Sequence, residues 1–273
     1  MAGGRSCRVK RLLGLAVVIA AFSVSAVAAA VGPWPGLARS VGGPDGVRYT
    51  VTRSESSTTV KAIRDGAVVA KASFDGAWGI PAITSTGTAG GLSHDGRILV
   101  LGQQSTPDHL RAQSLFLELS TADLSVRSTV VLNGEFGFDV LSPDARWLYL
   151  IQHTKSSDLV AYRVRAYDLR AQRLLPGTIV AKGESATMRG YPVTRATSKA
   201  GTWVYTLYTR GTGKPFVHAL NAAQRYAVCI DLPWESGNVW LAKLRLSNDD
   251  RRLVVRLNGA VLATIDTRSF KVT

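Results

Sequence analysis

Four carboxylate residues recur along the chain at intervals of 60, 49 and 51 residues, namely Asp75, Glu135, Glu184 and Glu235. Each stands near a glycine or an aromatic residue, in segments 75–78, 134–137, 183–185 and 234–237. Carboxylates can hold a cation or accept hydrogen bonds from a sugar, and aromatic rings can stack on an apolar ligand face. We therefore predict a ligand-binding group made of Asp75, Trp78, Glu135, Phe136, Glu184, Trp234 and Glu235. The alternative is a set of solvated loop carboxylates on a basic protein.

No other chemical constellation stands out. The histidines, His94, His109, His153 and His218, lack the spacing of metal ligands. The sequence has no nucleophile elbow, phosphate-binding loop or EF-hand loop. We therefore predict no metal site and no cofactor. Cys229 lies inside an apolar stretch, which favours a small buried side chain over a reactive thiol.

A repeated sequence motif accounts for the spacing of these residues. It consists of a serine, one or two polar residues, a turn and then an apolar strand. Its clearest copies are 93–100 and 142–149, with weaker copies at 198–205 and 247–254 and a degenerate one at 43–49. The steps between the four leading serines are 49, 56 and 49 residues. Each copy predicts a turn followed by an apolar strand, because Asp bonds its own backbone and Gly tolerates positive φ. Strand-rich repeats of 40 to 50 residues indicate a propeller.

Further strands follow each copy of the motif. The predicted closing strands are 126–132, 177–181, 226–231 and 269–272. Four strands per unit make one propeller blade. We therefore predict an all-β fold, a five-bladed β-propeller of four-stranded antiparallel blades, as a single domain over residues 44–273. The last strand is expected beside the first blade, to close the ring.

The predicted blades place the four carboxylates in equivalent loops. The loop that joins the outermost strand of one blade to the innermost strand of the next opens beside the axis, and the four carboxylates lie in such loops. We expect them around the mouth of the central channel. Two polar loops, 103–112 and 152–158, are expected on the same face; they are either functional or tolerated insertions.

The N-terminus predicts export. Residues 1–11 carry four basic residues and no acidic one, and 12–31 form an apolar run with small residues at its end. Residues 1–31 are thus a cleaved signal peptide or an uncleaved membrane anchor, and 32–43 are a linker. Cys7 precedes the apolar run and is therefore not expected to be a lipoprotein cysteine. We expect a secreted or extracytoplasmic protein, possible membrane attachment being limited to residues 12–31.

The charge favours an anionic partner. The chain has 33 Lys and Arg against 19 Asp and Glu, a net charge of +14, and 29 against 19 (+10) without the four N-terminal basic residues. Such a surplus favours anionic components of the cell envelope or an unknown protein as partner. We expect no nucleic acid, because no recognition motif is present.

Residues 142–149 together with 166–169 resemble bacterial propellers of the WD40-like, TolB-like and YVTN kind. Segments 216–221 and 227–233 are similar to uncharacterised secreted proteins of high-GC Gram-positive bacteria. The resemblance covers roughly residues 40 to 273 and implies the fold alone, because propellers include enzymes, binding proteins and scaffolds.

Three functions are compatible with this resemblance. The favoured one is an extracytoplasmic interaction module that binds a protein or cell-envelope ligand on its channel face. The alternative is a carboxylate-dependent hydrolase or lyase acting on glycans at the channel, which needs two carboxyl groups about 5–10 Å apart. The third is a purely structural propeller domain. A deep axial pocket with paired carboxylates would favour the enzyme.

Overall fold

The computed structural model describes residues 36–105, 109–210, 213–234 and 239–273. All of them belong to one compact unit, Val31–Thr273. The predicted signal or anchor segment, residues 32–35 of the predicted linker and Glu235 lie outside the described residues. Two short strands, Leu37–Ala38 and Ser40–Gly42, form within the described part of the predicted linker. Among the residues described, no helix is long and apolar enough to cross a bilayer.

The repeated motif folds as the sequence predicts, into a turn that leads into a strand. In Ser93, Ser142, Ser198 and Ser247 the hydroxyl oxygen accepts a hydrogen bond, at 2.9–3.0 Å, from the main-chain N–H five residues later. In three copies the same hydroxyl donates to the aspartate two residues on, at 2.6 Å. The fourth residue of each copy has a positive φ, 72° at Gly96 and 69° at Gly201. The serine and the left-handed residue therefore define each turn.

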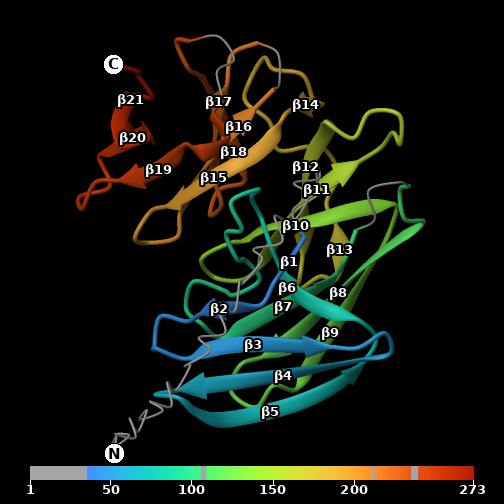
Figure 1. Cartoon of the computed structure of the whole chain (residues 1–273). Helices are drawn as coiled ribbons and strands as arrows, with labels where there is room; N and C mark the ends of the chain where they lie inside the picture. The colour runs from blue at the N-terminus through green and yellow to red at the C-terminus, as the bar shows by residue number, and fades with distance from the viewer. Residues whose placement is uncertain (1–35, 106–108, 211–212, 235–238) are drawn as a thin grey trace, which may run out of the picture. The chain divides into compact units, whose positions relative to one another are not determined.

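Five antiparallel sheets follow one another along the chain (Figure 1). Their strands are as follows. Sheet 1 contains β2 (Ser40–Gly42), β3 (Arg48–Arg53), β4 (Ser57–Arg64) and β5 (Ala67–Asp75). Sheet 2 contains β1 (Leu37–Ala38), β6 (Trp78–Pro81), β7 (Ile98–Gln103), β8 (Gln113–Ser120) and β9 (Val126–Asn133).

The other three sheets have the same order of strands. Sheet 3 contains β10 (Glu135–Leu141), β11 (Trp147–His153), β12 (Ala161–Asp168) and β13 (Arg173–Leu174), and β14 (Met188–Arg189) also pairs with β12. Sheet 4 contains β15 (Tyr191–Thr197), β16 (Trp203–Thr209), β17 (Phe216–Asn221) and β18 (Tyr226–Asp231). Sheet 5 follows the short 3-10 helix η1 (Val239–Leu241) and contains β19 (Lys243–Leu246), β20 (Arg252–Leu257) and β21 (Ala260–Asp266).

Two predicted closing strands differ from the structure. Residues 177–181 form no strand; sheet 3 ends instead on β13, because Pro176 lacks an N–H for the ladder and Gly177 has a φ of 79°. Residues 269–272 pair with β21 only through the bridge of Ile265 with Val272. The sequence predicted strands at both places because each repeat was expected to end with a closing strand.

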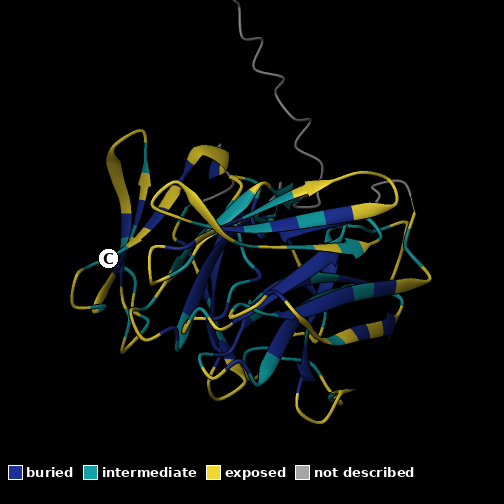
Figure 2. Ribbon diagram, turned by 90° about the horizontal axis from the view of Figure 1, so that it is seen from below, coloured by how far each residue is buried: buried dark blue, intermediate teal, exposed yellow. Residues whose placement is uncertain are grey.

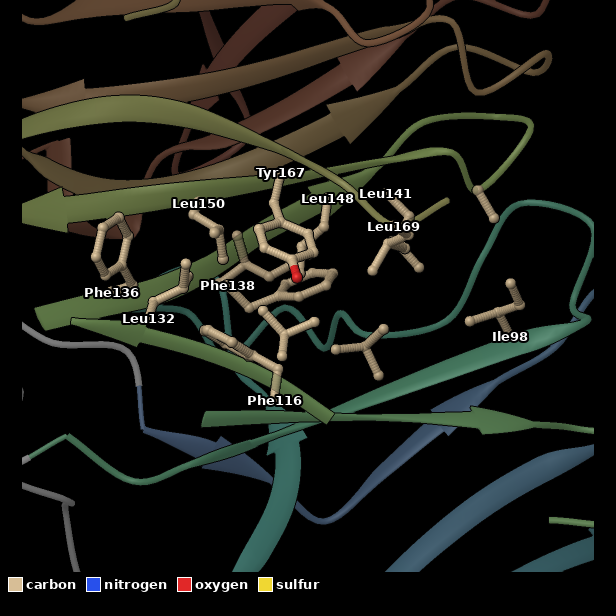
Figure 3. Packing of buried hydrophobic residues seen from close by; sticks show 14 residues of the cluster. Ile98, Phe116, Leu132, Phe136, Phe138, Leu141, Leu148, Leu150, Tyr167 and Leu169 are labelled. Atoms are coloured by element: carbon tan, nitrogen blue, oxygen red, sulfur yellow. The ribbon is translucent and has the colours of Figure 1, made fainter. Parts of the chain in front are cut away.

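The core lies between successive sheets, in four apolar clusters. One cluster packs sheet 1 against sheet 2, and the others pack sheet 2 on 3, 3 on 4, and 4 on 5. Figure 3 shows the second of these, where Phe116 and Leu132 of sheet 2 face Phe138 and Leu150 of sheet 3. β7 is therefore buried along almost its whole length, and Figure 2 shows buried strands in the interior of the molecule.

The two terminal sheets are covered on one face only. Burial alternates along β4 and β20, as expected for sheets with one solvated face. Within the described part of the chain, no strand pairing or apolar cluster joins sheet 5 to sheet 1. The predicted closure of the ring by the last strand is thus not found there, since Val272 pairs within its own sheet.

Candidate functional site

The first strands of sheets 2, 3 and 4 come together around an inserted loop. After β6 the chain leaves sheet 2 at Ala82 and returns at Gly91, whose carbonyl accepts a hydrogen bond from Val100 N–H at 2.7 Å. The loop, residues 82–90, reaches β15 of sheet 4. There Ser85 N–H donates to the Pro192 carbonyl at 2.8 Å, and the Thr86 hydroxyl donates to the Val193 carbonyl at 2.9 Å.

A partly enclosed cavity of about 70 Å³ lies where this loop and the three sheets meet. Five aromatic rings contribute to its wall, from Phe116, Phe136, Phe138, Tyr162 and Tyr208. On this measure a single water molecule needs only about 10–15 Å³. The cavity is therefore large enough for several waters or for a small ligand.

A few polar groups interrupt this apolar wall: Gln103, Ser105, Asp139, His153 and the two tyrosine hydroxyls. The rings of Tyr162 and Tyr208 stack with their centroids 5.3 Å apart. Tyr162 is 2% exposed, and its hydroxyl lies beside the Tyr208 hydroxyl but forms no hydrogen bond of good geometry with the described residues. Burying a hydroxyl without a well-formed hydrogen bond costs about 1–3 kcal/mol, so this hydroxyl is a natural contact for a polar atom inside the cavity.

A buried ion pair fixes the wall between sheets 3 and 4. The Arg195 guanidinium from β15 donates to the Asp139 carboxylate from β10, and also to the Asp139 carbonyl at 2.7 Å. Its Nε donates to the Thr206 hydroxyl at 2.9 Å. The side chains of Asp139 and Arg195 are 4% and 6% exposed. This pair holds the two first strands together at the cavity.

A second ion pair lies at the start of β10. Glu135 is buried, and its carboxylate accepts bonds from the Arg111 side chain at 2.6 Å, the Arg111 main-chain N–H at 2.9 Å and the Ser105 hydroxyl at 2.8 Å. Arg111 also donates to the carbonyls of Gln103 and Phe136. Glu135 thus anchors the ends of the loop that precedes β8, and its oxygens already have partners.

The structure does not bring the predicted ligand-binding group together. Trp78 and Phe136 are buried in apolar clusters, and of the six predicted residues that the structure describes only Phe136 lines the cavity. Asp75 is exposed at the end of β5, and Trp234 packs against the cluster between sheets 4 and 5. Glu184 is exposed and lines a separate hollow beside Cys229. Glu235 lies outside the described residues.

Sequence reasoning named Phe136 and the two polar loops that contain Gln103, Ser105 and His153, but it missed the other cavity residues. Asp139 stands inside an apolar strand, and a carboxylate at such a position is the one signal that could have marked it. Tyr162 and Tyr208 are indistinguishable in sequence from other strand aromatics. Within the described residues, no three His, Cys, Asp or Glu side chains are close enough to hold a metal ion. Cys229 is half-buried, and burial raises the pKa of its thiol to about 11, so the thiol stays protonated.

Comparisons with known proteins bear on the fold alone. The β-propeller domain of Cps50 (Swd1) from Myceliophteria thermophila is 13% identical, with a TM-score of 0.52, over 87% of this chain and 70% of that one. A functionally unknown protein from Desulfotomaculum acetoxidans is 12% identical, with a TM-score of 0.52, over 88% and 68%. The fold is a β-propeller. No family model and no curated protein matches the propeller chain.

Two buried histidines should make the stability of the propeller depend on pH. Burial lowers the pKa of His218 to about 4, although the Asp139 carboxylate opposes this, and burial also lowers the pKa of His153 to about 4. Both are neutral in the folded state at pH 6, whereas the unfolded chain takes up protons below its ordinary pKa of about 6.5. The contribution of the two neutral histidines to the free energy of unfolding is therefore fully present above about pH 6.5. It should fall as the pH drops towards 4.

Urea unfolding between pH 7.5 and pH 4.5 measures this fall. His218→Gln should reduce it, because one of the two histidines no longer takes up a proton on unfolding. His94→Gln, at an exposed position, is the matched control and should leave it unchanged. An undiminished pH dependence in the His218 variant would contradict the assignment.

Proposed function

We propose that the chain is an extracytoplasmic binding module, a five-bladed propeller that holds a ligand in the cavity between sheets 2, 3 and 4. Five consecutive antiparallel sheets support the blade number. The basic, then apolar, then small-residue N-terminal sequence supports export. Cell fractionation with N-terminal sequencing tests the location, and an intact chain in the cytoplasm would reject it.

The observation that carries the binding function is the cavity and its wall. Ligand sites are typically concave and largely apolar, with a few polar groups that orient the ligand. The wall of aromatic rings and the buried Tyr162 hydroxyl, which lacks a hydrogen bond of good geometry, fit this description. The ligand class that fits is small and mainly apolar, with one group able to hydrogen-bond to that hydroxyl.

Phenol and benzene are suitable probes, because they share a ring and only phenol can form hydrogen bonds. We expect phenol to bind more tightly than benzene in a titration followed by two-dimensional NMR, with shifts at Tyr162 and Tyr208. Gly137→Val should weaken the binding of both phenol and benzene by roughly tenfold or more, since the added side chain would fill part of a cavity of this size. A Cβ at Gly137 meets nothing within 4 Å, so the variant should fold.

Two further variants make the test specific. Gly42→Val is the matched control: its Cβ also meets nothing within 4 Å, and Gly42 does not line the cavity. It should leave probe binding unchanged. Tyr162→Phe should abolish the preference for phenol over benzene. Failure of both probes to bind, or equal binding by the Gly137 variant, would reject the proposed site.

The alternative of a glycan-acting hydrolase or lyase stays a prediction. Asp139 lines the cavity and Glu135 precedes the lining residue Phe136; both carboxylates are buried, and each is bound by an arginine. The described residues therefore give no observation that favours a carboxylate acting on a substrate there.

A further inference from the structure

The open face of sheet 5 is basic. Lys243 and Arg245 alternate along β19 and are exposed, and Arg256 on β20 is exposed beside them. Lys243 stands directly opposite Arg256 in the ladder, and Arg245 opposite Val254. Like charges placed opposite each other destabilise a sheet. Lys243, Arg245 and Arg256 also line one hollow, so their charges concentrate in a single place.

In a closed propeller, sheet 1 would cover this face, but the open face of sheet 1 is basic as well. Lys61 on β4 stands directly opposite Lys71 on β5, and Thr50 on β3 is opposite Lys61. Arg48 on β3 is exposed on the same side of the sheet. Contact between the two open faces would bring like charges together, within one chain or between two copies.

These cations have no acidic partners of their own. In the described part of the chain, none of the basic residues on either open face forms an ion pair; they are Arg48, Lys61, Lys71, Lys243, Arg245, Arg252 and Arg256. Arg252 stands opposite Asp266 in the ladder, at the far end of β20 from Arg256. Arg256 donates only to the Gly259 carbonyl, at 3.0 Å. The cations of sheet 5 are thus available to an outside anion.

We propose that the open face of sheet 5 binds an acidic segment of a partner polypeptide. Charge complementarity requires an anion, and it excludes sheet 1 and a second copy as the occupant. Apolar side chains on this face favour a polypeptide over a phosphate polymer: Leu241 lines the hollow and is 64% exposed, and the half-buried Val254 lies between the cations. This surface is independent of the cavity, so either proposal can fail alone.

The test uses a short fluorescent peptide that alternates glutamate and valine, with the lysine–valine peptide as its opposite. The full chain should bind the acidic peptide, more weakly at high salt. Replacing Lys243, Arg245 and Arg256 together by Ser should weaken binding about tenfold or more. The matched control replaces the exposed Arg170, Arg173 and Lys182 by Ser, which removes the same charge and should weaken binding less than about twofold.

A charge swap gives the decisive result. Lys243→Glu, Arg245→Glu and Arg256→Glu in one chain should reverse the preference, so that the lysine–valine peptide binds and the acidic one does not. Circular dichroism checks that each variant is folded. If the sheet 5 triple Ser variant and the control triple Ser variant weaken binding equally, only the net charge matters, and the proposal would be overturned. Binding of inorganic polyphosphate but not of the acidic peptide would also overturn it.

Discussion

Replacement of Arg195 by methionine is expected to lower the free energy of unfolding by about 3–5 kcal/mol, because it leaves the Asp139 carboxylate buried without a cation. For a domain of this size, that corresponds to a fall in melting temperature of roughly 6–20 °C. Thermal and urea unfolding measure the change. The matched control is Arg64→Met, which breaks the exposed pair of Arg64 with Asp45 and should cost less than about 1 kcal/mol.

Two further measurements separate the ion pair from simple loss of packing. The double variant Asp139→Leu with Arg195→Met should be more stable than Arg195→Met, since no unpaired charge remains. The pKa of His218 should rise in Arg195→Met, because the guanidinium helps to lower it. A double variant that is less stable than both single variants, together with an unchanged His218 titration, would contradict the role given to this pair.

Glu135→Gln is the second change with a large expected effect. It removes the charge that holds Arg111, so we expect the free energy of unfolding to fall by about 2–4 kcal/mol. Arg111 should also become more accessible, because Glu135 binds both its side chain and its main-chain N–H. Trypsin should then cleave after Arg111 faster than in the unaltered chain.

Glu118→Gln is the matched control for this cleavage. Glu118 is also a buried carboxylate, bound by Arg127 and by the Ser128 hydroxyl, but it lies away from the Arg111 loop. This variant should lose stability without faster cleavage after Arg111. Equal cleavage in the two variants would show that Glu135 does not anchor the loop.

The sequence predicted the turns well because each turn depends on residues that are neighbours in the chain. Ser142, Asp144 and the left-handed Ala145 interact within one turn, so their types and spacing are enough. The strand expected at 177–181 was wrong because its place in the repeat was given more weight than Pro176. The open outer faces of sheets 1 and 5 also could not be predicted. The repeat implies a closed ring, but it does not show whether the last sheet packs against the first.

The candidate site was harder to predict, because its contacts join residues far apart in the chain. Regular spacing put Glu135 at an equivalent place in its repeat, but it could not show that Arg111, 24 residues earlier, binds its carboxylate. Arg195 is 56 residues from Asp139, and no local pattern relates the two. The equal spacing of the carboxylates therefore reflects the repeat and not a common partner.

The loop at residues 82–90 bears on how the domain unfolds. Proteins made of repeats are usually held together only between neighbouring units, so they can lose structure one unit at a time. Here Ser85 and Thr86 of the second unit bond to Pro192 and Val193 of the fourth, which skips the third. Detaching either unit breaks this tether as well. The middle three units should consequently melt in one cooperative step, and fragments that end between them should not fold alone.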